Sequence, residues 1–155
     1  MEDLDMNKNM NKNMKLLTDV LDQLEVKYKI GEDKKHVKIG FRMENLRFDA
    51  IVILYEKLDI IRIITPLLLE VPEGNRANIL EFVNERNIQT LFGGFSLQEF
   101  HGKEFIEFGH AISLTKNDEG PKIFVNEISS IFKYMGFEVF HLFEEYEKTQ
   151  KAIKG

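Results

Sequence analysis

The sequence contains no cysteine and no tryptophan, and only three of its 155 residues are proline. Without cysteine the chain cannot form disulfides, thiolate zinc sites or iron–sulfur clusters, and it lacks a cysteine nucleophile. A chain of this length folds as one domain that buries about 68–70% of its extended surface, so it needs no such staple. The missing cysteine is typical of a reducing compartment, and we expect a cytoplasmic protein without a cofactor.

Basic residues are scattered along the chain, which carries a net charge of −5. The densest basic run, KYKIGEDKKHVK at residues 27–38, is interrupted by Glu32 and Asp33. This pattern predicts neither a nucleic-acid interface nor a patch for anionic membranes. The longest apolar clusters, at residues 50–55 and 60–71, are too short and too interrupted to cross a bilayer. We therefore expect neither nucleic acid nor a membrane as a partner.

Catalytic signatures are also missing. The sequence has no G-x-S-x-G elbow, no G-x-x-x-x-G-K-[ST] or G-x-G-x-x-G phosphate loop, and no H-E-x-x-H motif. The four histidines lie far apart in the sequence, and the paired carboxylates fall in polar segments that are typical of solvated surface. We therefore expect that the protein is not an enzyme and that it holds no metal.

The N-terminus repeats MNKN at residues 6–9 and 10–13 in a segment dominated by asparagine and lysine. We predict a disordered or frayed arm over residues 1–13, a single α+β domain over residues 14–150 and a frayed tail over residues 151–155. The chain does not begin with a basic segment followed by an apolar core, so its start predicts no signal peptide.

Apolar periodicity predicts the elements of this domain. Helical spacing marks residues 14–25, 75–86 and 121–146. Alternation or continuous apolar character marks strands at residues 26–30, 37–43, 46–55, 60–65, 91–97 and 106–114. The order α-β-β-β(-β)-α-β-β-α predicts an antiparallel sheet with helices packed on one side.

Four residues set local expectations within these elements. Pro66 cannot donate a ladder hydrogen bond, so its strand should end there or lie on a sheet edge. Asn87 is expected in the left-handed position after the middle helix, and Pro121 in the first turn of the last one. Gly136 leaves two alternatives, because the last helix either continues or kinks there, at a cost of about 1 kcal/mol relative to alanine.

Residues 91–114, LFGGFSLQEFHGKEFIEFGHAISL, concentrate glycine, phenylalanine and histidine. Gly93 and Gly94 precede a strand rather than a helix, so they predict a bulge or a close approach, not a phosphate loop. Gly102 supplies the positive φ of a hairpin turn, with His101 solvated at its tip. The segment is therefore predicted to be a two-stranded structural unit.

His110 is the polar residue on the apolar face of the returning strand, among Ile106, Phe108 and Ile112. It is either a tuned polar residue of a ligand pocket or a satisfied core residue bonded to a backbone carbonyl. We favour the second interpretation.

Phenylalanine is abundant, with 13 residues in the chain. In the last helix, Phe137 and Phe140 lie off the main apolar stripe, so the helix must be covered on more than one side. These rings fill either a large core or an apolar surface for a partner or a second copy of the chain. Candidate partner-binding residues are Phe92 and Phe95 on the sheet, with Phe137 and Phe140 on the helix.

Residues 15–147 resemble the YbjN family, whose members are described as sensory transduction regulators. The resemblance is carried by LTDVLDQLEVKYKI at residues 17–30, by residues 92–114 and by IFVNEISSIFKYMG at residues 123–136. It implies a fold like that of type III secretion chaperones, which are acidic homodimers that hold an extended client segment across apolar patches. Residues 60–71 fit less well, because such domains usually have three strands before the middle helix.

Two hypotheses follow. The first is a non-enzymatic, chaperone-like binding or regulatory module, a homodimer that holds a protein partner on an apolar surface of sheet and helix. The alternative is a small-ligand sensor with a pocket between sheet and helices, and with His110 as its polar residue.

Overall fold

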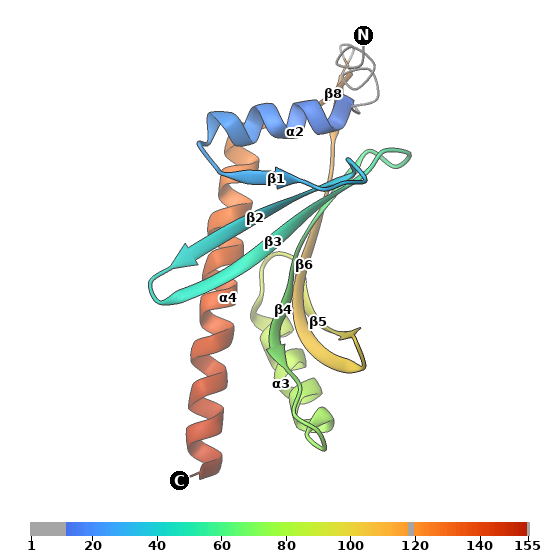
Figure 1. The fold of residues 1–155 in the computed structure, drawn as a ribbon. Helices are drawn as coiled ribbons and strands as arrows, with labels where there is room; N and C mark the ends of the chain where they lie inside the picture. The colour runs from blue at the N-terminus through green and yellow to red at the C-terminus, as the bar shows by residue number, and fades with distance from the viewer. Residues whose placement is uncertain (1–11, 118–119, 155) are drawn as a thin grey trace.

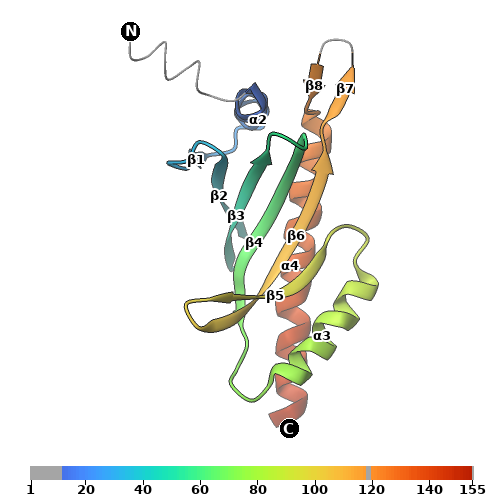
Figure 2. The ribbon, with the colours of Figure 1, turned by 90° about the vertical axis from the view of Figure 1, so that its right-hand side faces the viewer.

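The structure, a computed structural model, describes residues 12–117 and 120–154 and confirms the α+β domain. Its centre is a six-stranded antiparallel sheet in the order β1-β2-β3-β4-β6-β5 (Figures 1 and 2). In chain order the elements are α2 (Lys12–Gln23), β1 (Tyr28–Ile30), β2 (His36–Met43), β3 (Leu46–Tyr55), β4 (Ile60–Glu70), α3 (Arg76–Gln89), β5 (Gly94–Phe100), β6 (Lys103–Ser113), β7 (Thr115–Asn117), β8 (Gly120–Lys122) and α4 (Val125–Lys154).

One face of the sheet forms the core. Period-two alternation places Val37 opposite Val52, and Ile39 opposite Ala50, with all four side chains buried. Helix α4 covers this face with a buried apolar stripe, formed by Ile128, Ile131, Phe132, Met135, Val139 and Leu142. Helix α2 packs near the start of α4, and α3 lies near β5 (Figure 1). The helices therefore pack on one side of the sheet, as predicted.

Two helices extend beyond the boundaries that we predicted for the domain. Helix α2 begins at Lys12, and Asn13 is buried, so the helix starts within the last two residues of the segment predicted as an arm. Helix α4 runs unbroken through Gly136 and enters the predicted tail at residues 151–155. Residues 1–11 of the arm lie outside the described part of the chain.

Strand β4 corrects the expectation for Pro66. The strand does not end there and is not an edge strand, because it lies between β3 and β6 and continues to Glu70. Its ladder with β6 is irregular between Thr65 and Leu69, and Leu67 has a φ of 58°. Because the ladder is interrupted by a bulge at this point, no hydrogen bond to β6 is required from the nitrogen of Pro66, which has no N–H.

Two further expectations were wrong. The polar segment after β6 contains the small hairpin of β7 and β8, and α4 begins at Val125 rather than at Pro121. Helix α3 continues to Gln89, and Asn87 lies inside it without a positive φ, while Thr90 ends the helix in an extended conformation. The reason for the position of Asn87 is a contact to β5, described below.

The hairpin of β2 and β3 extends beyond its neighbours. Strand β1 pairs with β2 only as far as Ile39, and β4 pairs with β3 only from Ile51 onward. Among the described strands, residues 40–49 therefore pair only with each other. This outer half, which we name the hairpin arm, crosses α4 (Figure 1).

Candidate functional site

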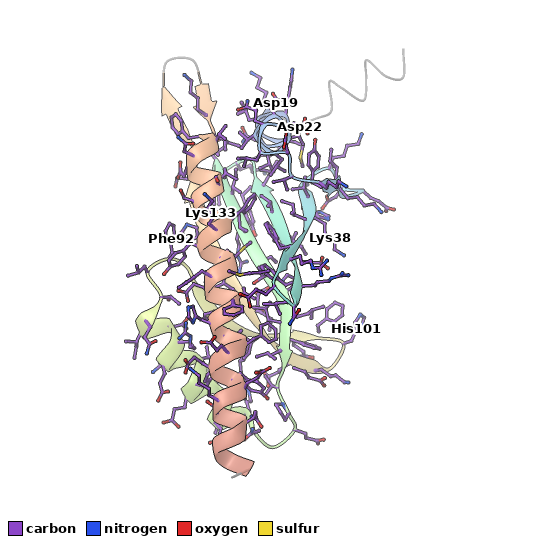
Figure 3. The ribbon with its side chains drawn as sticks, turned by 90° about the vertical axis from the view of Figure 1, so that its left-hand side faces the viewer. Asp19, Asp22, Lys38, Phe92, His101 and Lys133 are labelled. Carbon is purple, nitrogen blue, oxygen red and sulfur yellow. The ribbon has the colours of Figure 1, made fainter. Side chains whose placement is uncertain are left out.

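The hairpin of β5 and β6 has glycines where its backbone requires them. Gly93 has a φ of 64°, and a Cβ on it would collide with the carbonyl oxygen of Gly109. Gly102 has a φ of 78° at the turn, and His101 beside it is exposed at the tip (Figure 3). The segment is therefore a structural hairpin, in agreement with the prediction of strand and turn chemistry.

The two candidate phenylalanines of this hairpin are not equally accessible. Phe95 is only 4% exposed and packs edge-to-face on Phe108, with 5.0 Å between ring centroids, so its ring belongs to the core. Phe92 is half-buried between His110 and Tyr134, with ring centroids 4.7 and 4.8 Å away. The alternation of the strand turns Phe95 inward, where a partner cannot contact it in this conformation.

His110 lies in the sheet opposite Ile63 of β4 and is half-buried. Burial lowers its pKa because the charged imidazolium loses hydration, and the carboxylate of Glu127 opposes that change. Its ring contacts Phe92 edge-to-face. At neutral pH the neutral imidazole therefore packs as part of an aromatic cluster.

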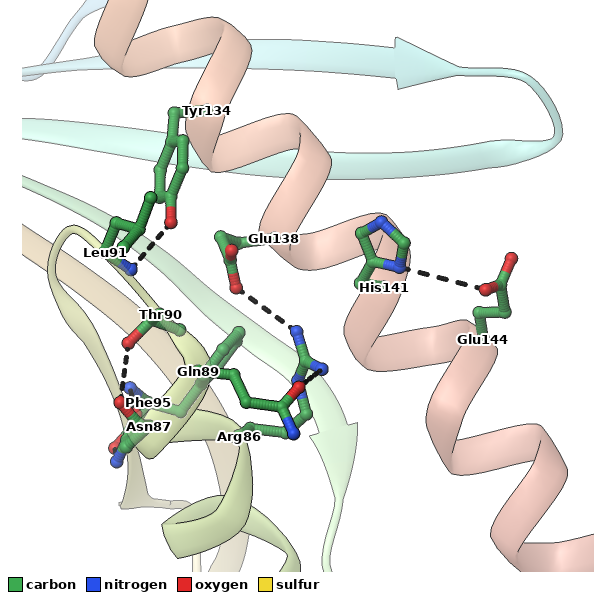
Figure 4. Close-up of polar contacts among 10 residues, drawn as sticks. All are labelled: Arg86, Asn87, Gln89, Thr90, Leu91, Phe95, Tyr134, Glu138, His141 and Glu144. Atoms are coloured by element: carbon green, nitrogen blue, oxygen red, sulfur yellow. Dashed lines mark hydrogen bonds and ion pairs between the residues drawn. The ribbon is translucent and has the colours of Figure 1, made fainter.

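A polar network joins α3 to α4 (Figure 4). Arg86 Nη2 lies 3.3 Å from Glu138 Oε2, and these side chains are only 11% and 6% exposed. The backbone N–H of Leu91 donates to the hydroxyl of Tyr134 at 2.7 Å. The ion pair of Arg86 and Glu138 was not predicted from the sequence. Its members are 52 residues apart, and each alone resembles a surface charge on a helix.

The other two candidate phenylalanines line two hollows beside the hairpin arm. The Phe137 hollow is about 350 Å³ and is lined by Phe41, Arg42, Met43, Phe48, Phe132, Lys133, Gly136 and Phe137. The Phe140 hollow is about 280 Å³ and is lined by Glu44, Asn45, Leu46, Phe140, Phe143, Glu144 and Glu147. Phe137 is 51% exposed, and Phe140 is half-buried. His141 contacts both rings, with centroids 4.2 and 6.0 Å away.

The two hollows carry charges of opposite sign. The charged residues that line the Phe137 hollow are Arg42 and Lys133, both positive, and neither forms an ion pair within the described part of the chain. Those that line the Phe140 hollow are glutamates, of which Glu144 lies near Lys148 of the next turn. We name the hollows, with the α4 face between them, the Phe137–Phe140 surface.

Aromatic walls with charged residues beside them are typical of protein interfaces, in which apolar side chains are buried and charges give specificity. Among residues 12–117 and 120–154, no group of three or more metal-ligating side chains comes together. No helix in the same ranges is long and apolar enough to span a bilayer.

The fold and this surface define an α+β domain with one helix-covered sheet face and an exposed aromatic surface. A model of the YbjN family, described as "Putative bacterial sensory transduction regulator", matches residues 13–115. The chain therefore belongs to the YbjN family, which confirms the resemblance found in the sequence. No curated protein sequence matches the chain.

Two solved structures align with the chain at low sequence identity. "Crystal structure of YbjN, a putative transcription regulator from E. coli" aligns at a TM-score of 0.65 and 12% identity, covering 86% of this chain and 90% of that one. A chain from "Structure of the HopA1-SchA Chaperone-Effector Complex" aligns at a TM-score of 0.49 and 16% identity, covering 83% and 88%. The first of these supports the fold alone.

Proposed function

We propose that the chain is a non-enzymatic, regulatory protein-binding module that holds a protein partner on the Phe137–Phe140 surface. One observation carries the proposal: Phe137 is 51% exposed although it lines an aromatic hollow. Burying such a ring fully is worth about 1.5–3 kcal/mol, and aromatic anchors of this kind dominate the energy of protein interfaces.

The geometry of this surface supports the proposal. Among the described strands, the hairpin arm has no neighbour beyond its own two strands. Both hollows are lined by residues of the arm and of α4, which leaves space for apolar side chains of a partner. Each hollow has the volume of one or two large side chains. Phe95 is not part of this surface, because it is buried. Phe92 is not part of it either, because its ring packs against His110 and Tyr134.

Site-specific photo-crosslinking in the native host tests the proposal. A photoreactive phenylalanine analogue at Phe137 should give a defined protein adduct, identified by mass spectrometry. The same analogue at Leu58, which is 67% exposed in the turn between β3 and β4, is the matched control. An adduct pattern that is the same at both positions, or no adduct at Phe137, would contradict the proposal.

The alternative function, a small-ligand sensor, gains no specific support from this geometry. His110 packs on Phe92 and lines neither hollow. A thermal-shift screen separates the two functions, since a metabolite that raises the melting temperature by several degrees would favour the sensor.

A further inference from the structure

A stripe of exposed and half-buried side chains runs along α4 through the Phe137–Phe140 surface. Its members recur at intervals of four and three residues: Lys133, Phe137, Phe140, Glu144 and Glu147. This spacing keeps side chains on one helix face, and it is the spacing that lets two helices pack side by side. In the view of Figure 3, α4 lies in front of the sheet, and no described helix or strand covers it.

The stripe is complementary to itself. The pairs Phe137/Phe140 and Lys133/Glu144 share one centre on the helix, between residues 138 and 139. If a second α4 lies antiparallel about this centre, Phe137 meets Phe140 of the second protomer, and Lys133 meets its Glu144. The positive Phe137 hollow then faces the negative Phe140 hollow, twice over, as a two-fold interface requires.

We propose that the Phe137–Phe140 surface binds a second copy of this chain, in a two-fold dimer with antiparallel α4 helices. This inference rests on the proposed function, because it names the partner of the same surface. The charges are the reason for choosing a second copy as the partner. A partner must place an acidic group opposite Lys133 and a basic group opposite Glu144, and an antiparallel α4 does both. Lys133, which has no ion-pair partner within the described protomer, gains Glu144 across the interface.

Charge exchange gives the first test. Lys133→Glu and Glu144→Lys should each weaken the dimer at least about tenfold in analytical ultracentrifugation, because each places like charges together at both contacts. The double variant restores both pairs and should dimerise like the wild type. Mixing the two single variants should give a heterodimer, in which both contacts join a glutamate to a lysine. Lys57→Glu, at an exposed position in the turn between β3 and β4, is the matched control and should leave dimerisation unchanged.

Cysteine crosslinking gives the second test, and the absence of native cysteine makes it clean. Positions 133 and 144 are about 16 Å apart along one helix at 1.5 Å per residue, too far for a disulfide within a chain. A double variant Lys133→Cys and Glu144→Cys should therefore form a covalent dimer on mild oxidation. A variant with cysteines at Lys57 and Lys133 should not.

The outcomes separate this inference from the proposed function. A monomer at high micromolar concentration, or a dimer that no charge exchange affects, would overturn the antiparallel arrangement. If Phe137 then still crosslinks to another protein, the proposed function stands and only the identity of its partner is wrong. If Phe137 gives no adduct at all, both are wrong.

Discussion

The side chain of Asn87 on α3 binds both backbone groups of Phe95 on the edge strand β5. Its Nδ2–H donates to the carbonyl oxygen of Phe95 at 2.9 Å, and the N–H of Phe95 donates to its Oδ1 at 2.6 Å. Asn87 therefore substitutes for a neighbouring strand at this point of the sheet edge. This contact also explains why Asn87 stays inside the helix rather than ending it.

Replacing Asn87 by alanine should lower the free energy of unfolding by about 1–3 kcal/mol, because two half-buried backbone groups lose their partner. Urea denaturation measures the change. The stability of Asn87→Asp should lie between those of the wild type and Asn87→Ala, since the aspartate keeps the hydrogen-bond acceptor and loses the donor. Asn84→Ala, exposed on the same helix, should change stability by less than about 0.5 kcal/mol. Equal effects at Asn84 and Asn87 would show that helix propensity alone is responsible.

The buried pair of Arg86 and Glu138 predicts a large, non-additive effect. Arg86→Ala should destabilise the protein by about 3 kcal/mol, because it leaves the buried Glu138 carboxylate without its cation. The double variant Arg86→Met and Glu138→Leu should recover most of that loss. The exposed pair of Arg76 and Glu104 is the control, and Arg76→Ala should cost less than about 1 kcal/mol. A double variant no better than the sum of its single changes would contradict this account.

His110 predicts a pH dependence of stability. Burial lowers its pKa in the folded state, so the unfolded chain binds the proton more readily. The contribution of His110 should therefore be constant above the ordinary histidine pKa of about 6.5 and should weaken stability as the pH falls through that value. His110→Gln should show a smaller drop in melting temperature between neutral and mildly acidic pH. His101→Gln, at the exposed hairpin tip, should leave the profile of the wild type intact.

Gly93 and Gly102 form a matched pair that separates steric collision from backbone strain. Both have positive φ, but a Cβ at Gly93 meets the Gly109 carbonyl oxygen, whereas one at Gly102 meets nothing within 4 Å. Gly102→Ala should cost about 1–2 kcal/mol, the strain of the left-handed region alone. Gly93→Ala should cost about 2–5 kcal/mol, because the collision adds to that strain. Equal losses in chemical denaturation would show that the close approach at Gly93 relaxes freely.

The predictability of this fold follows the range of the interactions that specify it. The alternation of Val37 and Ile39 is local, so the sequence alone predicts their strand and buried face. The position of β4 between β3 and β6 depends on contacts that are distant in sequence. Pro66 alone predicts an edge strand or a strand end, and the bulge near Leu67 that accommodates it has no local signal in the sequence. The same limit applied to Asn87, whose partner lies on another element.

The candidate site shows the same division. The off-stripe positions of Phe137 and Phe140 are visible in the helical pattern of the sequence, and the structure places Phe137 half-exposed. The opposite charges of the two hollows were not predicted, because Arg42 and Glu44 reach α4 only when the hairpin arm crosses it. Phe95 could have been recognised as a core residue, since it alternates with exposed Ser96 on its strand.

The order of elements along the chain has a consequence for synthesis on the ribosome. All six strands of the sheet precede α4, the 30-residue helix that covers their apolar face. At roughly 5–20 residues per second, several seconds pass between translation of the last of these strands and completion of that helix. Throughout this interval the apolar face of these strands, which α4 later covers, is exposed and prone to aggregation. The protein should therefore depend on holdase chaperones during translation far more than after release.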